Sequence, residues 1–238
     1  MASASKQCKG GTLHLIKIPQ KYKIRVAKMA ERAFAEASEL FEYHKPVEIV
    51  IFSSIREFVI PEVGIGAHAI IQGDIVVNID FSRHDITKVI QKELSSMLCH
   101  EFSHIVRASV HKNLYTTLIE SLITEGIASY AEKEIFKKKI LYIEPIENER
   151  KYWLQAQKNM YKNIYNHGEW FYGTKKLPRW IGYRLGYLIV NSFMEQQKNL
   201  SFAQLVRIKS SEVLRGFDSK LKASSIKGSK ASNLDTTL

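Results

Sequence analysis

The sequence is poor in cysteine and has no long hydrophobic run. Its two cysteines, Cys8 and Cys99, cannot form a disulfide framework, so a reducing, cytoplasmic setting is expected. No window approaches the roughly 18 consecutive apolar residues of a membrane-spanning helix. The first nine residues are polar and lack the apolar core of a signal peptide. These absences argue against a membrane protein and against a secreted disulfide scaffold.

Acidic residues are scarce at both ends of the chain, which accounts for most of the net charge of +11. Residues 1–25 hold six Lys or Arg and no acid, and residues 219–238 hold four Lys against Asp235. The middle of the chain is close to neutral, and no compact basic stripe with interleaved aromatics stands out. Solvated termini are the simpler interpretation, so no nucleic acid partner is expected. The oligomeric state stays open.

A globular core is expected, because 45% of the residues are hydrophobic and 25% are charged. The periodicity predicts a helix over 21–43, a strand over 47–52, and a hairpin of strands 67–71 and 75–79 around Gly73. The rest of the pattern is helical, with helices predicted over 85–109, 114–136, 148–166, 179–197 and 201–208. A small β-rich half followed by an α-rich half indicates an α+β fold.

The length of the chain favours one domain over residues 1–218. Residues 219–238 are rich in Ser, Lys and Ala and have little to bury, which predicts a disordered tail. No internal repeat with a period of roughly 20 to 50 residues is visible.

The strongest chemical signal lies in the predicted helix 85–109, where His100, Glu101 and His104 form the pattern H-E-x-x-H. The two His are four residues apart and project from one helical face, so both imidazoles can reach one zinc ion. Glu101 can stand beside the metal without binding it, as a general base must. The helix also carries an apolar stripe, made by Ile90, Leu94, Leu98, Phe102 and Ile105.

A catalytic zinc site needs a third protein ligand. The pattern H-E-x-x-H-x-x-G-x-x-H fails here, because its last two defined positions hold Arg107 and Val110. Cys99 is a poor ligand, because adjacent residues on a helix point about 100° apart, and a buried small hydrophobe is the simpler role for it. The third ligand is therefore expected on the next helix.

Two acids on the predicted helix 114–136 compete for this role, Glu120 and Glu125. Glu125 is favoured, because its neighbours one turn away are small, so that this face could pack closely against the helix that carries the two His. Those neighbours are Ser121, Ala128 and Ser129. Gly126 also allows a near approach of the two helices. A solvent-facing acid is the ordinary alternative for either Glu.

The H-E-x-x-H motif at residues 100–104 is followed by a gap of 20 residues and then by the stretch 125–130. This arrangement resembles the gluzincin metallopeptidases, the thermolysin-like clan. The likeness is closer to a bacterial family of predicted zinc-dependent proteases, which is also similar to the stretch 178–187. It covers about residues 47–195. The resemblance implies one zinc ion per chain, with Glu101 as the residue that activates water. It places the zinc ligands at His100, His104 and Glu125.

The resemblance also implies a zincin-like fold, in which a small mixed sheet precedes the two zinc helices. An edge strand of that sheet would bind an extended peptide or protein substrate. Strands 67–71 and 75–79 are the candidates, and both could equally be plain interior strands.

The oxyanion of peptide hydrolysis needs a hydrogen-bond donor. Tyr183 and Tyr187 are candidates, because they lie one helical turn apart in the family-like stretch, and Tyr183 is preferred. His167 is a weaker candidate. The predicted function is a zinc-dependent peptidase that hydrolyses peptide bonds with metal-activated water. The alternative is a catalytically silent zinc-binding module of the same fold, with a regulatory or interaction role.

Overall fold

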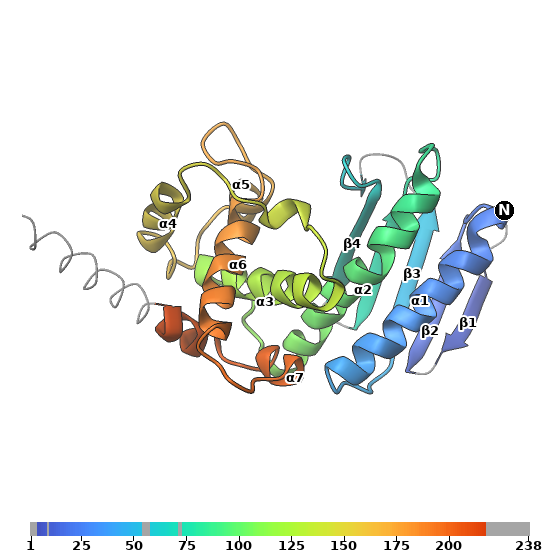
Figure 1. The fold of residues 1–238 in the computed structure, drawn as a ribbon, viewed down its shortest axis with the longest axis horizontal. Coiled ribbons are helices and arrows are strands. Elements are labelled where there is room, and N and C mark those ends of the chain that lie inside the picture. The colour runs from blue at the N-terminus through green and yellow to red at the C-terminus, as the bar shows by residue number, and fades with distance from the viewer. Residues whose placement is uncertain (1–3, 9, 54–57, 71–72, 218–238) are drawn as a thin grey trace, which may run out of the picture. The chain divides into compact units, whose positions relative to one another are not determined.

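A computed structural model describes residues 4–8, 10–53, 58–70 and 73–217 (Figure 1). Contacts divide the chain into two compact units. The sheet unit comprises Met1–Lys112, Ala131–Lys138 and Phe202–Arg207, and the helical unit comprises Asn113–Tyr130, Lys139–Ser201 and Ile208–Leu238. The predicted single domain over 1–218 stays a prediction, and the predicted tail 219–238 lies outside the described residues.

The sheet unit begins with five strands, which pair in the order β1-β2-β3-β5-β4. The three central strands are parallel, and each outer strand runs antiparallel to its neighbour. The strands are β1 (Ala4–Cys8), β2 (Gly11–Ile16), β3 (Val47–Ser53), β4 (Ile65–Ile70) and β5 (Asp74–Ile79). This mixed sheet, followed by a mainly helical half, confirms the α+β prediction.

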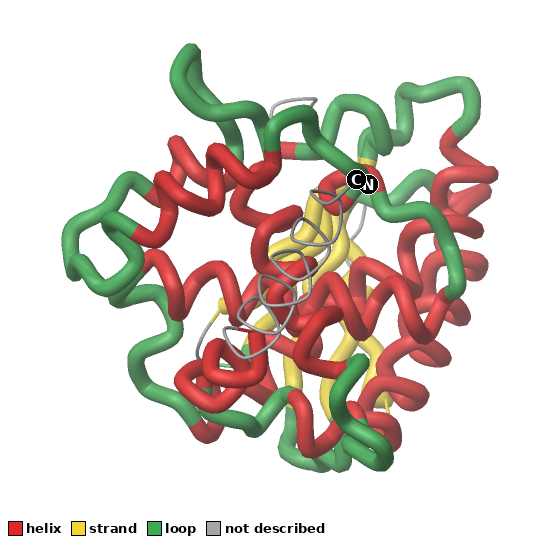
Figure 2. The backbone as a smooth tube through the Cα atoms, turned by 60° about the vertical axis from the view of Figure 1, so that its left-hand side comes forward, coloured by secondary structure: helices red, strands yellow, loops and turns green. Residues whose placement is uncertain are grey.

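Two long helices, α1 (Gln20–Leu40) and α2 (Ile86–Val110), pack against each other across one face of this sheet (Figure 1). Figure 2 shows the strands in yellow from a second direction. Alternate strand residues are buried beneath the helices, as the period of two requires. Among the buried strand residues that alternate in this way are Leu13, Leu15, Ile49, Ile51, Ile75 and Val77.

Helix α2 is buried without interruption from Ser96 to Arg107. The predicted apolar stripe is confirmed, since all five of its members are buried. Phe102 anchors the helix, because its ring contacts Phe34 and Tyr43 edge-on and Phe41 in a stacked arrangement, at centroid distances of 5.3, 5.8 and 6.1 Å. The face that carries the sequence motif is thereby held on a rigid element.

The helical unit holds most of the remaining elements. None of the helices in the described part of the chain is long and apolar enough to cross a membrane. Helix α3 (Leu118–Phe136) begins in this unit, and its last turns belong to the sheet unit. The elements that follow are η2 (Leu141–Ile143), α4 (Glu149–Gln157), α5 (His167–Phe171), α6 (Ile181–Met194), α7 (Phe202–Leu205), which belongs to the sheet unit, and a helical segment at residues 210–217.

Three sequence expectations differ from the structure. The N-terminal residues form β1 and β2, rather than the solvated terminus that their basic composition indicated. The helix predicted over 148–166 ends at Gln157. The helix predicted over 201–208 is the short α7, with a second helical segment after it. In the first of these cases, β2 pairs with β3, which is distant in the sequence, and a local pattern cannot predict such a pairing.

Helices α3 and α6 cross with their backbones in contact at two glycines. A Cβ atom on Gly126 would lie 2.2 Å from the Gly186 carbonyl oxygen, and one on Gly186 would lie 2.0 Å from the Leu122 carbonyl oxygen. Gly126 does allow a close approach, but the helix that approaches it is α6. The crossing fixes the part of α3 that carries Glu125.

We expect Gly126→Ala to lower the free energy of unfolding by at least about 2 kcal/mol, because the new methyl group collides with backbone rather than with a movable side chain. Chemical denaturation measures this change. Gly168→Ala is the matched control, since among the described residues a Cβ there meets the Asn166 side chain alone, at 3.4 Å. Equal stability of the two variants would contradict the close crossing.

Candidate metal centre

Helix α2 presents His100 and His104 from one face, one turn apart. Both side chains are buried, with 6% and 7% of their surface exposed, and their ring centroids lie 5.0 Å apart. Two imidazoles removed from water need hydrogen-bond or metal partners for their nitrogens. The pair is therefore suited to bind a metal ion.

Glu125 of α3 completes a three-residue cluster. One carboxylate oxygen of Glu125 and one ring nitrogen of each His all lie within 4.8 Å of one another. Glu125 is buried as well, with 6% exposed. Two imidazole nitrogens and one carboxylate oxygen are a ligand set of catalytic zinc sites, in which water or substrate takes the remaining position. The donor chemistry thus fits zinc.

Glu132 contacts His100, the first His of the candidate site. Its Oε2 lies 3.2 Å from Nδ1 of His100, and both side chains are buried. When ionised, this carboxylate can only accept, and Nδ1 of His100 then carries the proton while Nε2 keeps the lone pair that a metal needs. Lys138 Nζ lies 3.4 Å from the other carboxylate oxygen of Glu132 and also contacts Glu93. The buried charge of Glu132 is thereby compensated.

We expect Glu132→Gln to weaken zinc binding by about 10- to 100-fold, because the amide no longer holds the imidazole as an anion does. Competition with a chromogenic chelator measures the affinity. Glu134→Gln on the same helix is the control, since among the described residues that carboxylate pairs with Lys137, three positions further along the helix. Unchanged affinity in Glu132→Gln, with native circular dichroism, would rule out this orienting role.

Glu101 follows His100 on α2 and is itself buried, with 8% of its surface exposed. Its neighbour Cys99 is also buried, and burial raises the pKa of the thiol, with a smaller contribution from the charge of Glu132. A thiol that stays protonated behaves as a small hydrophobe rather than as a metal ligand. This agrees with the role expected for Cys99.

Three polar aromatic side chains gather near Glu125 within the helical unit. The Tyr115 hydroxyl donates to Oε1 of Glu125 at 3.4 Å, and the rings of Tyr115 and His167 are 6.0 Å apart. His167 Nδ1 lies 3.3 Å from the Tyr165 hydroxyl. Burial lowers the pKa of His167, and the nearby charge of Glu125 offsets this only in part. Burial thus favours the neutral form of the His167 imidazole.

Sequence reasoning missed Tyr115 and Tyr165. Tyr115 stands ten residues before Glu125 in a connecting segment, and no motif singles it out. Tyr165 is held by the hydroxyl of Ser121, one turn before Glu125 on α3. Ser121 was expected to form part of a small packing face, and the structure pairs it with this tyrosine instead.

The other sequence candidates lie elsewhere in the helical unit. Tyr183 packs its ring against Tyr142 and Phe171, at centroid distances of 5.0 and 5.1 Å. Tyr187 is buried against Tyr130, with its hydroxyl 3.4 Å from Asn191 Oδ1. The catalytic role of Tyr183 stays a prediction. Glu120 is not part of the three-residue cluster, and its carboxylate accepts a hydrogen bond from Ser210.

Comparison with known proteins gives one similar fold and one matching family model. It is similar in fold to an aminopeptidase N family protein from Idiomarina loihiensis, with a TM-score of 0.52 and 13% sequence identity over 91% of this chain. The match spans 41% of that longer protein. No curated protein matches the chain. A family model described as a predicted Zn-dependent protease, DUF2268, matches residues 26–215. The chain therefore belongs to this family of predicted Zn-dependent proteases.

Proposed function

We propose that the protein is a zinc-dependent peptidase of the gluzincin type, which hydrolyses peptide bonds. The observation that carries the proposal is the buried cluster of His100, His104 and Glu125, with Glu101 adjacent to the first ligand. A zinc site with only a structural role does not need this additional buried carboxylate. The main alternative, a zinc-binding module without turnover, leaves Glu101 unexplained.

One zinc ion per chain would be held by His100, His104 and Glu125. When bound, zinc lowers the pKa of a water molecule and polarises the carbonyl of the scissile bond. Glu101 accepts the proton of the attacking water and passes it to the leaving amine nitrogen, as a general base and then a general acid. Because Glu101 is buried, little bulk water is present to compete with its carboxylate as the acceptor of that proton.

The oxyanion that forms during hydrolysis needs a hydrogen-bond donor. Tyr115 and His167 are supported by their placement beside Glu125, with a hydroxyl and a neutral imidazole respectively. Tyr183 remains the candidate from the family-like stretch. All three side chains can donate without a change of protonation state at neutral pH.

A peptide or protein substrate is supported by the edge of the sheet. Of the two candidate strands, β5 is interior, and β4 is the outer strand next to it. Strand β4 also packs against α2, which carries both His ligands. An extended peptide can add to such an edge by main-chain hydrogen bonds.

A cytoplasmic setting is part of the proposal. Both cysteines, Cys8 and Cys99, are free, as is usual in that reducing compartment.

The experiment that tests the function measures zinc content and peptide cleavage together. We expect about one zinc per chain, as three ligands for one tetrahedral ion require. Cleavage of a mixed peptide library, followed by mass spectrometry, should stop after chelation and return when zinc is added. Zinc binding without cleavage of any peptide would instead favour the silent module.

A further inference from the structure

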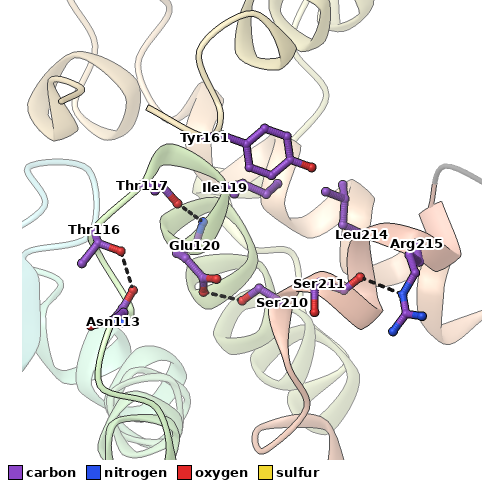
Figure 3. A pocket seen from close by; sticks show the side chains of 10 residues that line it. All are labelled: Asn113, Thr116, Thr117, Ile119, Glu120, Tyr161, Ser210, Ser211, Leu214 and Arg215. Atoms are coloured by element: carbon purple, nitrogen blue, oxygen red, sulfur yellow. Dashed lines mark hydrogen bonds between the residues drawn. The ribbon is translucent and has the colours of Figure 1, made fainter. Parts of the chain in front are cut away.

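The helical unit contains a cavity of about 530 Å³ that the proposed peptidase chemistry does not use (Figure 3). Its walls come from residues 113–120 at the start of α3, from Tyr161, and from residues 210–215. The volume is within the range of small-molecule sites. Glu120, the acid that is not part of the metal cluster, is one of the residues that line this cavity.

The cavity is separate from the candidate zinc ligand on the same helix. Glu120 precedes Glu125 by five residues, which is a rotation of about 140° around the helix axis. The two carboxylates therefore leave α3 in different directions. What binds beside Glu120 need not touch Glu125.

One side of the cavity is acidic. Ser210 donates to Oε2 of Glu120 at 2.5 Å, and among the residues that the structure describes this is the one hydrogen bond of the carboxylate. The first backbone N–H groups of α3 are already bonded, Ile119 to the Met160 carbonyl and Glu120 to the Thr117 hydroxyl. The carboxylate, rather than backbone amides, is therefore the group offered to a ligand here, and it suits an ammonium group.

The other side of the cavity is basic. Figure 3 shows Arg215 and Glu120 on opposite sides of the view, with Ser210 and Ser211 between them. Arg215 Nε donates to the Ser211 carbonyl at 3.4 Å, which anchors the side chain to its own helical segment. A guanidinium has five N–H donors and pairs well with a carboxylate.

Apolar side chains form a further side of the cavity, above the serines in the view of Figure 3. Ile119 and Leu214 are buried and line the cavity, and the ring of Tyr161 stands over them with 67% of its surface exposed. A ligand that fits this arrangement has an ammonium group, a carboxylate group and an apolar body. Short peptides with apolar side chains have all three, with the two charges at opposite ends of the molecule.

We propose that this cavity binds a short peptide with apolar side chains, its terminal ammonium group on Glu120 and its terminal carboxylate on Arg215. Such a molecule is also the product class of a peptidase, a connection that rests on the proposed function. The binding itself does not depend on turnover.

Isothermal titration calorimetry of the full chain with L-leucyl-L-leucine and L-leucyl-L-leucyl-L-leucine tests the proposal, each with and without a zinc chelator. We expect at least one of these zwitterions to bind, and equally well in the presence of the chelator. Leucyl-leucinamide and N-acetyl-leucyl-leucine, which each lack one charge, should bind at least about tenfold more weakly. Chromatography of the same samples checks that the peptides are intact.

Glu120→Gln and Arg215→Gln should each weaken binding at least about tenfold. Glu212→Gln and Lys209→Gln are the matched controls, because both side chains are exposed and neither lines the cavity. Four results would each overturn the proposal: no binding of either zwitterion at millimolar concentration, equal binding of the blocked ligands, loss of binding with the chelator, or full binding by both cavity variants.

Discussion

Glu101→Gln is expected to reduce peptide cleavage by about a hundredfold to ten-thousandfold while zinc stays bound, because the amide cannot accept the proton of the attacking water. The three side chains that form the metal cluster are unchanged in this variant. The replacement has nearly the same size as the native side chain, so the buried position is still filled. Steady-state cleavage of the best library peptide and zinc content by emission spectrometry measure the two quantities.

The matched control for this variant is Glu147→Gln, which makes the same chemical change at an exposed position. Parental activity in the control and a large loss in Glu101→Gln would support the general-base role. If Glu101→Gln cleaved peptides as fast as the parent with equal zinc content, another group would have to accept the proton. If it lost zinc as well, the residue would be part of the metal site rather than its base.

His104→Gln is expected to lose both zinc and peptide cleavage. The variant removes one of three protein ligands, and the remaining imidazole and carboxylate do not complete a catalytic zinc site. We expect zinc content to fall from about one per chain to near zero after dialysis. Glutamine keeps a side chain of similar length at this buried position, which limits the loss of packing.

His84→Gln is the control for this experiment, because His84 is exposed near the start of α2 and is not part of the metal cluster. Circular dichroism distinguishes loss of the site from loss of the fold. A folded His104→Gln protein that still held one zinc would show that the metal lies elsewhere. The zinc motif would then be a buried helix with two His, and the proposed mechanism would fail.

Much of the candidate site could be predicted from local sequence. The spacing of His100 and His104 defines a helical face by itself, because residues four apart on a helix are neighbours. Glu125 could be ranked above Glu120 from its small neighbours, and the structure brings Glu125 to the His pair. The reason was only partly right, since Gly126 contacts α6 and Ser121 contacts Tyr165.

Other parts of the site have no local signal. Glu132 is recognised as the partner of His100 only when α2 and α3 are in contact, because the two residues are 32 positions apart. Tyr115 and His167 likewise come together near Glu125 from separate segments. Before folding, each is an ordinary polar aromatic residue. Their relation to the cluster depends on packing between elements rather than on spacing within one.

The sequence by itself determined the α+β order, the long buried helix that became α2 and the common face of its two His, because these depend on periodicity within single elements. It did not determine that the basic N-terminus would form β1 and β2, since that pairing depends on a strand more than 30 residues away. Only the tertiary structure selected β4 as the outer strand, paired His100 with Glu132 and opened the cavity beside Glu120. Each of these is a contact between distant segments, and local propensity carries no information about such contacts until the core has assembled.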